Sequence, residues 1–409
     1  MRQHKTTYRN RQSTGSAAYF GVVEPGSTTL RLLVVQVADG QATVSGWAEA
    51  PGWAAEKMEP ASLVAVCEKA LAQAEEMAQA SDGRPVLPDQ ILVGLPASRL
   101  RGRAWSIRQH RSHPERPVDE EELNALLART LRLTINRLGD ENPDEPGWLL
   151  LDAVAVALTV DGHGVTDPVG FRGQEIGATV FAALAQGQVI ETWGLVAREL
   201  EFSALTLTAS PLALAACLSA PQAMLVDVGG ATTDLIWTRA GRPVMLESLS
   251  TGGAELTGSL AYRWKLLPDR AERLKYSYSS GGLTAEVRAQ VQEVLWPSLQ
   301  AWFEQMEAAM ARLSRDEPLP PHLFLLGGGS ALPEMAEAVR SLAWSQQLHF
   351  TRYPQVGRLR PADVPGVANR TSRGRQMGDV SALALAAWAA QQQQPPERPA
   401  RILQELCQA

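Results

Sequence analysis

The sequence predicts an α/β fold with two related halves, and three observations support this. Short apolar runs of strand length alternate with amphipathic segments of helical period. A turn that combines an acidic residue with glycine joins two strands within residues 20–37 and again within residues 224–237. A third glycine turn, at residues 327–329, connects a strand to a helix. Since the first two turns share one plan, we expect two halves that face a common cleft.

The composition limits the classes of function. The chain has 409 residues, enough for two to four packed units, and its net charge of -6 gives no general affinity for nucleic acid. The three cysteines lack metal-site spacing, so we expect no zinc site, no disulfide framework and a reduced, cytoplasmic setting. No apolar run reaches the roughly 18 residues of a membrane span. Residues 1–17 are polar and basic, and we expect a disordered tail.

The elements follow in order from residue 20. Residues 20–37 predict strand, turn and strand, residues 41–50 a third strand, residues 60–80 a helix and residues 90–97 a buried strand. A helix with acids in its first turn begins near residue 118, strands lie near 148–160, and 179–202 return to strand and helix. Residues 256–278 and 285–313 are predicted helical, with a kink or break at Pro297, and residues 322–342 give strand, turn and helix. A Gln/Pro linker and a short helical tip end the chain.

The stretch MLVDVGGATTDLIW carries the chemistry of the second turn. Asp227 stands among residues that favour burial, so its carboxylate needs a partner. Gly229 and Gly230 let backbone N–H groups approach an anion, and Thr232 and Thr233 can add hydroxyl donors. A carboxylate placed here can hold a hydrated Mg²⁺ that bridges to phosphate. A tight hairpin with a solvated aspartate explains the same pattern, and both interpretations stay open.

The first turn, VVEPGSTT, repeats this plan. Glu24 precedes Gly26 as Asp227 precedes Gly229, and Ser27 and Thr28 supply hydroxyls. The third turn, LFLLGGGSALPEM, suits close approach to a base or a phosphate, although an ordinary strand-to-helix turn needs the same glycines. The predicted nucleotide contacts of the third turn are Gly327, Gly328 and Gly329.

Two acid-glycine hairpins and a late glycine turn, in this order, resemble the actin, Hsp70 and sugar-kinase superfamily, and most closely the bacterial cell-division protein family FtsA. The resemblance implies an actin-like (ribonuclease H-like) two-lobed fold with a nucleotide cleft for ATP and Mg²⁺. PDRAERLK resembles a helix of the family in which Glu272 would bind the ribose and Lys275 would lie along the base. Glu24 and Asp227 would hold Mg²⁺ through water.

The resemblance also implies a domain organisation. The segment LTVDGHGVTDPVGFRGQEIGATV is similar to a signature of the inserted 1C subdomain of FtsA, which is SHS2-like. The implied assignment is subdomain 1A at 18–98, 179–222 and 361–390, the insert 1C at 99–178, subdomain 2A at 223–244 and 311–360, subdomain 2B at 245–310, and linker and tip at 391–409.

Two positions depart from hydrolytic relatives. Glu24 replaces the usual aspartate and is followed by Pro25, and Ser210 in TASPLALAAC stands where relatives such as MreB carry a catalytic glutamate. No general base for the attacking water is evident there. We therefore expect ATP binding with weak or absent hydrolysis.

The implied function is that of a divisome adaptor at midcell, which binds the C-terminal peptide of an FtsZ-like tubulin homologue, self-associates, and contacts the inner face of the membrane through its C-terminal helix. Actin-like folds can stack head to tail, and whether this chain forms filaments stays open. Ile402, Leu403 and Leu406 form the apolar face of that tip, which is small, so partner docking or fraying stays an equal alternative to membrane contact. The other family considered is the pilus-assembly adaptor PilM, and DPVGFRG favours the division branch. A small-molecule kinase is disfavoured because the first motif is altered.

Overall fold

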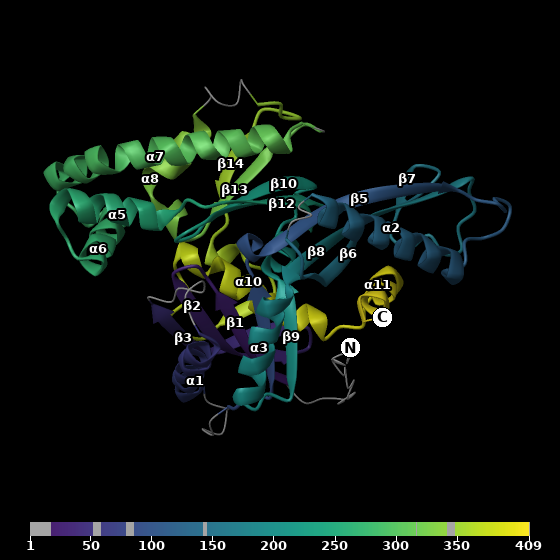
Figure 1. Ribbon diagram of the computed structural model, residues 1–409, viewed down its shortest axis with the longest axis horizontal. Helices are drawn as coiled ribbons and strands as arrows, with labels where there is room; N and C mark the ends of the chain where they lie inside the picture. Colours follow the sequence, from purple (N-terminus) through teal and green to yellow (C-terminus); the bar gives the residue numbers. More distant parts are fainter. Residues whose placement is uncertain are drawn as a thin grey trace.

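The computed structural model describes residues 18–51, 59–78, 86–141, 145–315, 317–341 and 348–408, so the predicted tail at 1–17 lies outside it. The described chain forms a first lobe, a second lobe and an inserted unit that projects to one side (Figure 1). No helix within the described ranges is long and apolar enough to cross a membrane.

The first lobe is built on a sheet whose described strands have the order β15-β3-β2-β1-β4-β9. Alternation along β1 places Val22 against one face and Val23 against the other, so the sheet is covered on both sides. Helices α1 and α3 cover one face and α10 the other. The bounds are β1 Ala18–Pro25, β2 Thr29–Ala38, β3 Gln41–Pro51, α1 Pro60–Met77, β4 Gln90–Leu95, α3 Gly187–Glu199, β9 Ala204–Ala209, α4 Ser210–Ala216, β15 Val367–Asn369 and α10 Val380–Gln392.

The second lobe and the insert share one sheet, ordered β14-β13-β10-β11-β12-β5-β8-β6-β7 among the described strands. The lobe part comprises β10 Gln222–Val228, β11 Thr233–Arg239, β12 Arg242–Leu249, β13 His322–Leu326 and β14 Gln355–Arg358. Strand β12 pairs with β5 at Met245 and Arg103. The two parts therefore meet through a very short ladder.

The insert packs helix α2 on its own sheet. Its elements are β5 Leu100–His110, α2 Glu120–Asp140, β6 Trp148–Val160, β7 His163–Val165 and β8 Glu175–Gln186. Helix α2 begins where expected, because Asp119 accepts a hydrogen bond from the Glu122 N–H at 2.8 Å and acids fill the first turn. The predicted boundary at residue 178 is corrected, since β8 runs through it without interruption.

The remaining helices lie over the second lobe (Figure 1). They are α5 Gly253–Trp264, α6 Pro268–Ser279, α7 Ala285–Leu313 and α8 Pro333–Arg340, and the C-terminal α11 Arg398–Gln408 lies on the insert; short 3₁₀ turns cover Ala97–Arg99, Gly328–Ala331, Pro361–Asp363 and Met377–Asp379. The helix expected over 256–278 is in fact two, because Lys265 adopts a left-handed φ of 54° and Pro268 starts a new helix. Pro297 does not break α7, which buries Leu295 and Leu299 on either side of it.

Candidate functional site

The two acid-glycine turns meet at the interface of the lobes, as their shared plan predicts. The Ala231 N–H donates to Ser27 Oγ at 2.8 Å. A Cβ placed on Gly230 would lie 2.3 Å from Thr28 Cγ2, so this approach requires glycine. Gly229 also lies beside Ser27, since a Cβ placed on Gly229 would lie 3.7 Å from Ser27 Oγ. The hydroxyls of the first turn therefore contact the backbone of the second turn.

Asp227 is the next-to-last residue of β10 and lies beside the third glycine turn. A Cβ on Gly327 would lie 2.3 Å from Asp227 Oδ1, and the φ of Gly327 is 80°, so a side chain is excluded on two grounds. Gly329 is packed equally closely, since its Cβ would lie 2.5 Å from Val228 Cγ1. Ser381 Oγ of α10 donates to Asp227 Oδ2 at 3.3 Å. Three segments far apart in the sequence thus converge on one carboxylate.

The pKa of Asp227 is raised to about 7. Burial is the main cause, and the charges of Asp234 and Glu24 add to it, while Ser381 and Arg31 oppose it. Among the described residues, no Lys, Arg or His side chain forms an ion pair with this carboxylate. A hydrated cation placed here would lower the pKa again, because an opposite charge favours the ionised form.

Glu24 has a different partner. Arg31 Nη1 donates to Glu24 Oε2 at 2.8 Å, and Arg31 Nε donates to Asp379 Oδ1 at 3.0 Å. Burial still raises the pKa of Glu24, with Arg31 acting against it. The predicted water-mediated Mg²⁺ contact of Glu24 stays a prediction, and one oxygen of its carboxylate, Oε2, already accepts from a guanidinium. In the described chain no group of three or more His, Cys, Asp or Glu side chains is arranged for a metal. Asp227 has no cationic partner there, so its carboxylate would fit a water-mediated contact.

Arg31, Asp379 and Ser381 are functional candidates that the sequence reasoning missed. The antiparallel register of β1 and β2 places Arg31 directly opposite Glu24. That pair could have been found by extending the hairpin outward from its turn. Asp379 and Ser381 had no local signal, because α10 reaches the cleft only through the tertiary fold.

The two threonines of the second turn differ in role. Thr233 is fully buried, its Oγ1 donates to the Thr251 carbonyl at 2.8 Å, and Trp302 Nε1 donates to the same Oγ1 at 2.9 Å. The predicted phosphate contact of Thr233 is therefore corrected to a structural role. Thr232 is partly exposed, and its carbonyl accepts from the Gly229 N–H at 2.9 Å to close the turn.

Glu272 and Lys275 share one face of α6, as predicted. Their charged groups pair at 2.8 Å, and Lys275 Nζ also donates to Thr257 Oγ1 at 2.7 Å and to the Gly253 carbonyl at 2.8 Å. The Gly253 N–H donates to the Gly229 carbonyl at 2.9 Å. A continuous set of contacts therefore runs from the second turn through α5 to the predicted ribose and base residues.

Ser210 is buried at the start of α4, next to the place where the insert meets the first lobe. Asp152 of β6 accepts hydrogen bonds from the Ala209 N–H at 2.6 Å and from Thr208 Oγ1 at 3.0 Å. Burial raises the pKa of Asp152 to about 6. This carboxylate already has two donors, so its evident role is to fix the insert to the lobe.

The C-terminal helix α11 lies on the insert. Ile402 and Leu403 are fully buried in the same core as Leu123 and Leu126 of α2, and Leu406 packs at its edge. Arg398 pairs with Asp167 at 2.5 Å, and Arg401 with Glu120 at 2.7 Å. The predicted membrane-facing or partner-facing tip is therefore corrected, because its apolar face is used within the chain.

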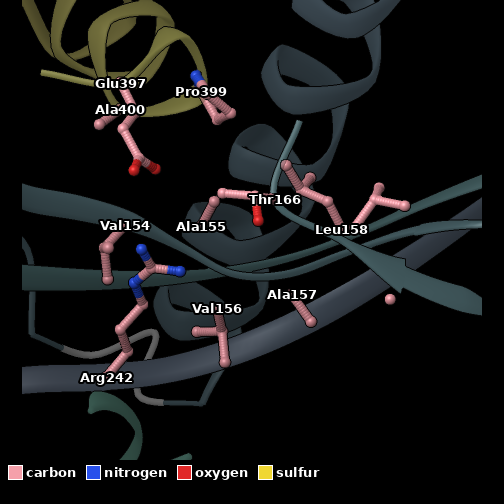
Figure 2. A pocket seen from close by; sticks show the side chains of 12 residues that line it. Val154, Ala155, Val156, Ala157, Leu158, Thr166, Arg242, Glu397, Pro399 and Ala400 are labelled. Carbon is pink, nitrogen blue, oxygen red and sulfur yellow. The ribbon is translucent and has the colours of Figure 1, made fainter. Parts of the chain in front are cut away.

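A cavity of about 360 Å³ lies between α11, β6 and β7 (Figure 2). Strand β6 pairs with β8 along its length, but on its other edge it pairs with β7 only from Leu158 to Val160. Arg242 and Glu397 extend into the cavity from opposite sides (Figure 2). Its floor is five successive residues of β6, Val154, Ala155, Val156, Ala157 and Leu158.

Comparison with known proteins establishes the fold. The PilM chain of the PilM–PilN type IV pilus biogenesis complex superposes with a TM-score of 0.63 and 17% identity, over 91% of this chain and 98% of that one. The protein has an actin-like ATPase fold. The structure of the ethanolamine utilization protein EutJ from Carboxydothermus hydrogenoformans is a weaker match, with a TM-score of 0.48 and 15% identity over 92% of each chain.

In sequence, the chain is 26% identical to the ethanolamine utilization protein EutJ of Escherichia coli over 143 residues, 35% of this chain and 46% of that protein. EutJ of Salmonella typhimurium matches to the same extent. The chain thus spans about half the length of the curated relatives that it matches. No protein-family model matches it.

Proposed function

We propose that this protein is an actin-fold adaptor that binds ATP and holds an extended peptide of a partner, and that it serves type IV pilus assembly. The setting is suggested by the likeness to PilM, which extends over 91% of this chain including the insert. PilM itself was solved in complex with PilN, a second pilus protein.

Among the described strands, the edge of β6 before Leu158 has no neighbour opposite β8, and this open edge is the observation that carries the adaptor role. An exposed strand edge offers backbone N–H and C=O groups to an added strand, which gives affinity without demanding a particular sequence. Here the edge borders the cavity, and α11 packs beside it. A strand added at this edge would lie in line with β7. Arg242 and Glu397 would select a peptide with an acidic and a basic side chain at the matching places.

ATP binding is supported by the contact between the two hairpins at Ser27 and Ala231 and by the Gly327 turn, which lies beside Asp227. Gly26, Gly229, Gly230, Gly328 and the hydroxyls of Ser27 and Thr28 would contact the phosphates, while Asp227 would hold Mg²⁺ through water. When bound, the metal would supply positive charge at the phosphates. Since Arg31 holds Glu24 and Ser210 offers no carboxylate, we propose slow hydrolysis or none.

A division adaptor that binds an FtsZ-like protein at midcell is the second candidate, and the segment DPVGFRG favours it. In the structure this segment also has a local role, because the Val118 N–H donates to the Phe171 carbonyl and the Gly170 N–H to the Val118 carbonyl, each at 2.8 Å. These bonds hold the chain at the entry to α2. The segment therefore has a structural explanation that any protein with this insert could share.

In both settings we propose that the protein stays cytoplasmic and reaches the inner face of the membrane through its partner, since α11 is docked on the insert. We also propose that the protein self-associates into filaments. A head-to-tail contact between copies that does not close into a ring produces a filament.

Affinity purification from cross-linked cells of the source organism tests the proposal. We expect the tagged protein to recover inner-membrane pilus proteins, and Arg242→Glu to recover fewer because the cavity loses its positive side. Arg108→Glu, on β5 of the insert, is the matched control. Recovery of an FtsZ-like protein, together with localisation of the tagged protein at midcell, would favour the cell-division function over pilus assembly. Recovery of neither class by wild type would overturn the adaptor role.

A further inference from the structure

A second hollow, of about 430 Å³, lies between α8 and the end of β14, the outermost described strand of the second lobe. Strand β10, which carries Asp227, is two strands further in. The hollow is thus separate from the cleft and from the cavity beside β6. Its described lining is Pro333, Ala336, Glu337, Arg340, Gly357, Arg358 and Arg360.

The lining concentrates positive charge. Arg340 comes from the last turn of α8, Arg358 from the end of β14, and Arg360 from the segment after it. Within the described chain none of the three forms an ion pair. The connection 341–354 between α8 and β14 contains no aspartate or glutamate in its sequence. This clustering occurs in a protein whose net charge is -6.

Arg358 is the least exposed of the three arginines. Burial lowers the pKa of its guanidinium, and the charges of Arg340 and Arg360 lower it further. The Arg358 Nε is also buried without a hydrogen-bond partner in the described chain. A buried unsatisfied donor destabilises the folded state, and such a group in a native protein calls for an unobserved partner.

The simplest alternative is a set of solvated arginines. It suits Arg340, which is exposed and favoured at a helix C-terminus by the helix dipole. It does not account for the unpartnered Nε of Arg358, nor for three like charges around one hollow.

We propose that this hollow is an anion site that binds a phosphate group through Arg340, Arg358 and Arg360. One guanidinium group can donate two parallel hydrogen bonds to two oxygens of the same phosphate. Glu337 on the α8 wall would repel the phosphate itself, but it can accept a hydrogen bond from a hydroxyl on the same ligand. The ligand class is therefore a phosphate ester with a free hydroxyl, either in solution or as a lipid headgroup.

Thermal unfolding with glycerol 3-phosphate, at constant ionic strength and without nucleotide, tests the site. Wild type should gain Tm with ligand concentration, as binding to the folded state requires. Arg340→Gln and Arg360→Gln should bind about tenfold more weakly, because each removes a charge-assisted hydrogen bond. Without ligand the same variants should have a higher Tm than wild type, because they relieve repulsion on Arg358. A purely structural role for these arginines predicts the opposite sign.

Arg352→Gln is the matched control, since Arg352 is exposed in the same basic segment but does not line the hollow. Asp227→Ala separates the hollow from the cleft and should leave the phosphate response intact. Co-sedimentation with phosphatidylglycerol and phosphatidylcholine vesicles identifies the source of the phosphate. Response to glycerol 3-phosphate alone indicates a soluble ligand, and Arg340-dependent sedimentation with phosphatidylglycerol alone indicates a headgroup. Absence of both responses, or equal responses in all variants, overturns the proposal.

Discussion

The first and second acid-glycine hairpins have the same plan in sequence, but their carboxylates have different partners in the structure. Glu24 faces the Arg31 guanidinium, which also reaches Asp379, so the first hairpin contains its own cation. Asp227 has a serine hydroxyl and two nearby acids, and its pKa rises to about 7. A repeated motif therefore predicts a repeated backbone but not the same partners for the two carboxylates. The second hairpin is the half that would gain from an external cation.

Arg31→Met should have the largest effect, since it leaves Glu24 and Asp379 buried without a positive partner. Breaking a buried pair in this way costs about 3–5 kcal/mol in the free energy of unfolding. Denaturant unfolding measures the loss, and adding Glu24→Gln should restore part of it. A loss that Glu24→Gln leaves unchanged would mean that the two hairpins do not differ as described.

Asp227→Ala should leave the fold intact and weaken ATP binding in Mg²⁺ by a factor on the order of 10², the usual effect of losing a water-mediated metal contact. Fluorescent-nucleotide titration with Mg²⁺ and with EDTA measures it. The variant should bind equally weakly in both buffers. Unchanged affinity in Mg²⁺ would remove Asp227 from the nucleotide site.

The titration of Asp227 should make the free energy of unfolding depend on pH. Its pKa is about 7 in the folded protein against 3.8 for the free side chain, so the folded state retains a proton that the unfolded chain has released. Stability should therefore fall as pH rises from about 4 to about 7, and Asp227→Asn should reduce that fall. Asp234 and Asp152, with pKa values raised to about 6, act in the same direction and leave a residual slope. Asp39→Asn, at an exposed turn, is the control and should reproduce the wild-type profile of Tm against pH.

Ser27→Ala should have the smallest effect. It removes the acceptor of the Ala231 N–H at the contact between the hairpins, and one solvent-accessible hydrogen bond contributes at most about 1 kcal/mol. Chemical denaturation is sensitive enough to detect it. A loss as large as that of Arg31→Met would show that the hairpin contact, and not the ion pair, dominates the cleft.

The sequence was sufficient for the fold because its signals were local. Strands β1, β2, β10 and β11 follow from apolar runs around glycine turns, and the resemblance of these turns to known motifs indicated the actin-like fold. Where packing decides, the sequence was insufficient. Thr233 was predicted to bind phosphate because its position beside two glycines was visible, whereas the Trp302 indole that engages it lies on a distant helix.

The same limit applies to the C-terminal helix. Its apolar face was correctly recognised, but the choice among membrane, partner and insert depends on the complementary surface of α2, which periodicity does not reveal. The arginine hollow escaped notice for the same reason, since Arg340 and Arg358 become neighbours only when α8 packs beside β14.

The short ladder between β12 and β5 has a mechanical consequence. A peptide pulled from its place beside β6 would transmit tension through β8 and β5 along a hydrogen-bonded sheet. That tension reaches β12 where Met245 pairs with Arg103, and β12 is joined to the hairpin that carries Asp227. The Met245–Arg103 pair therefore lies on a hydrogen-bonded path from a strand bound beside β6 to the cleft, in parallel with the Asp152 contacts that fix the insert to the first lobe.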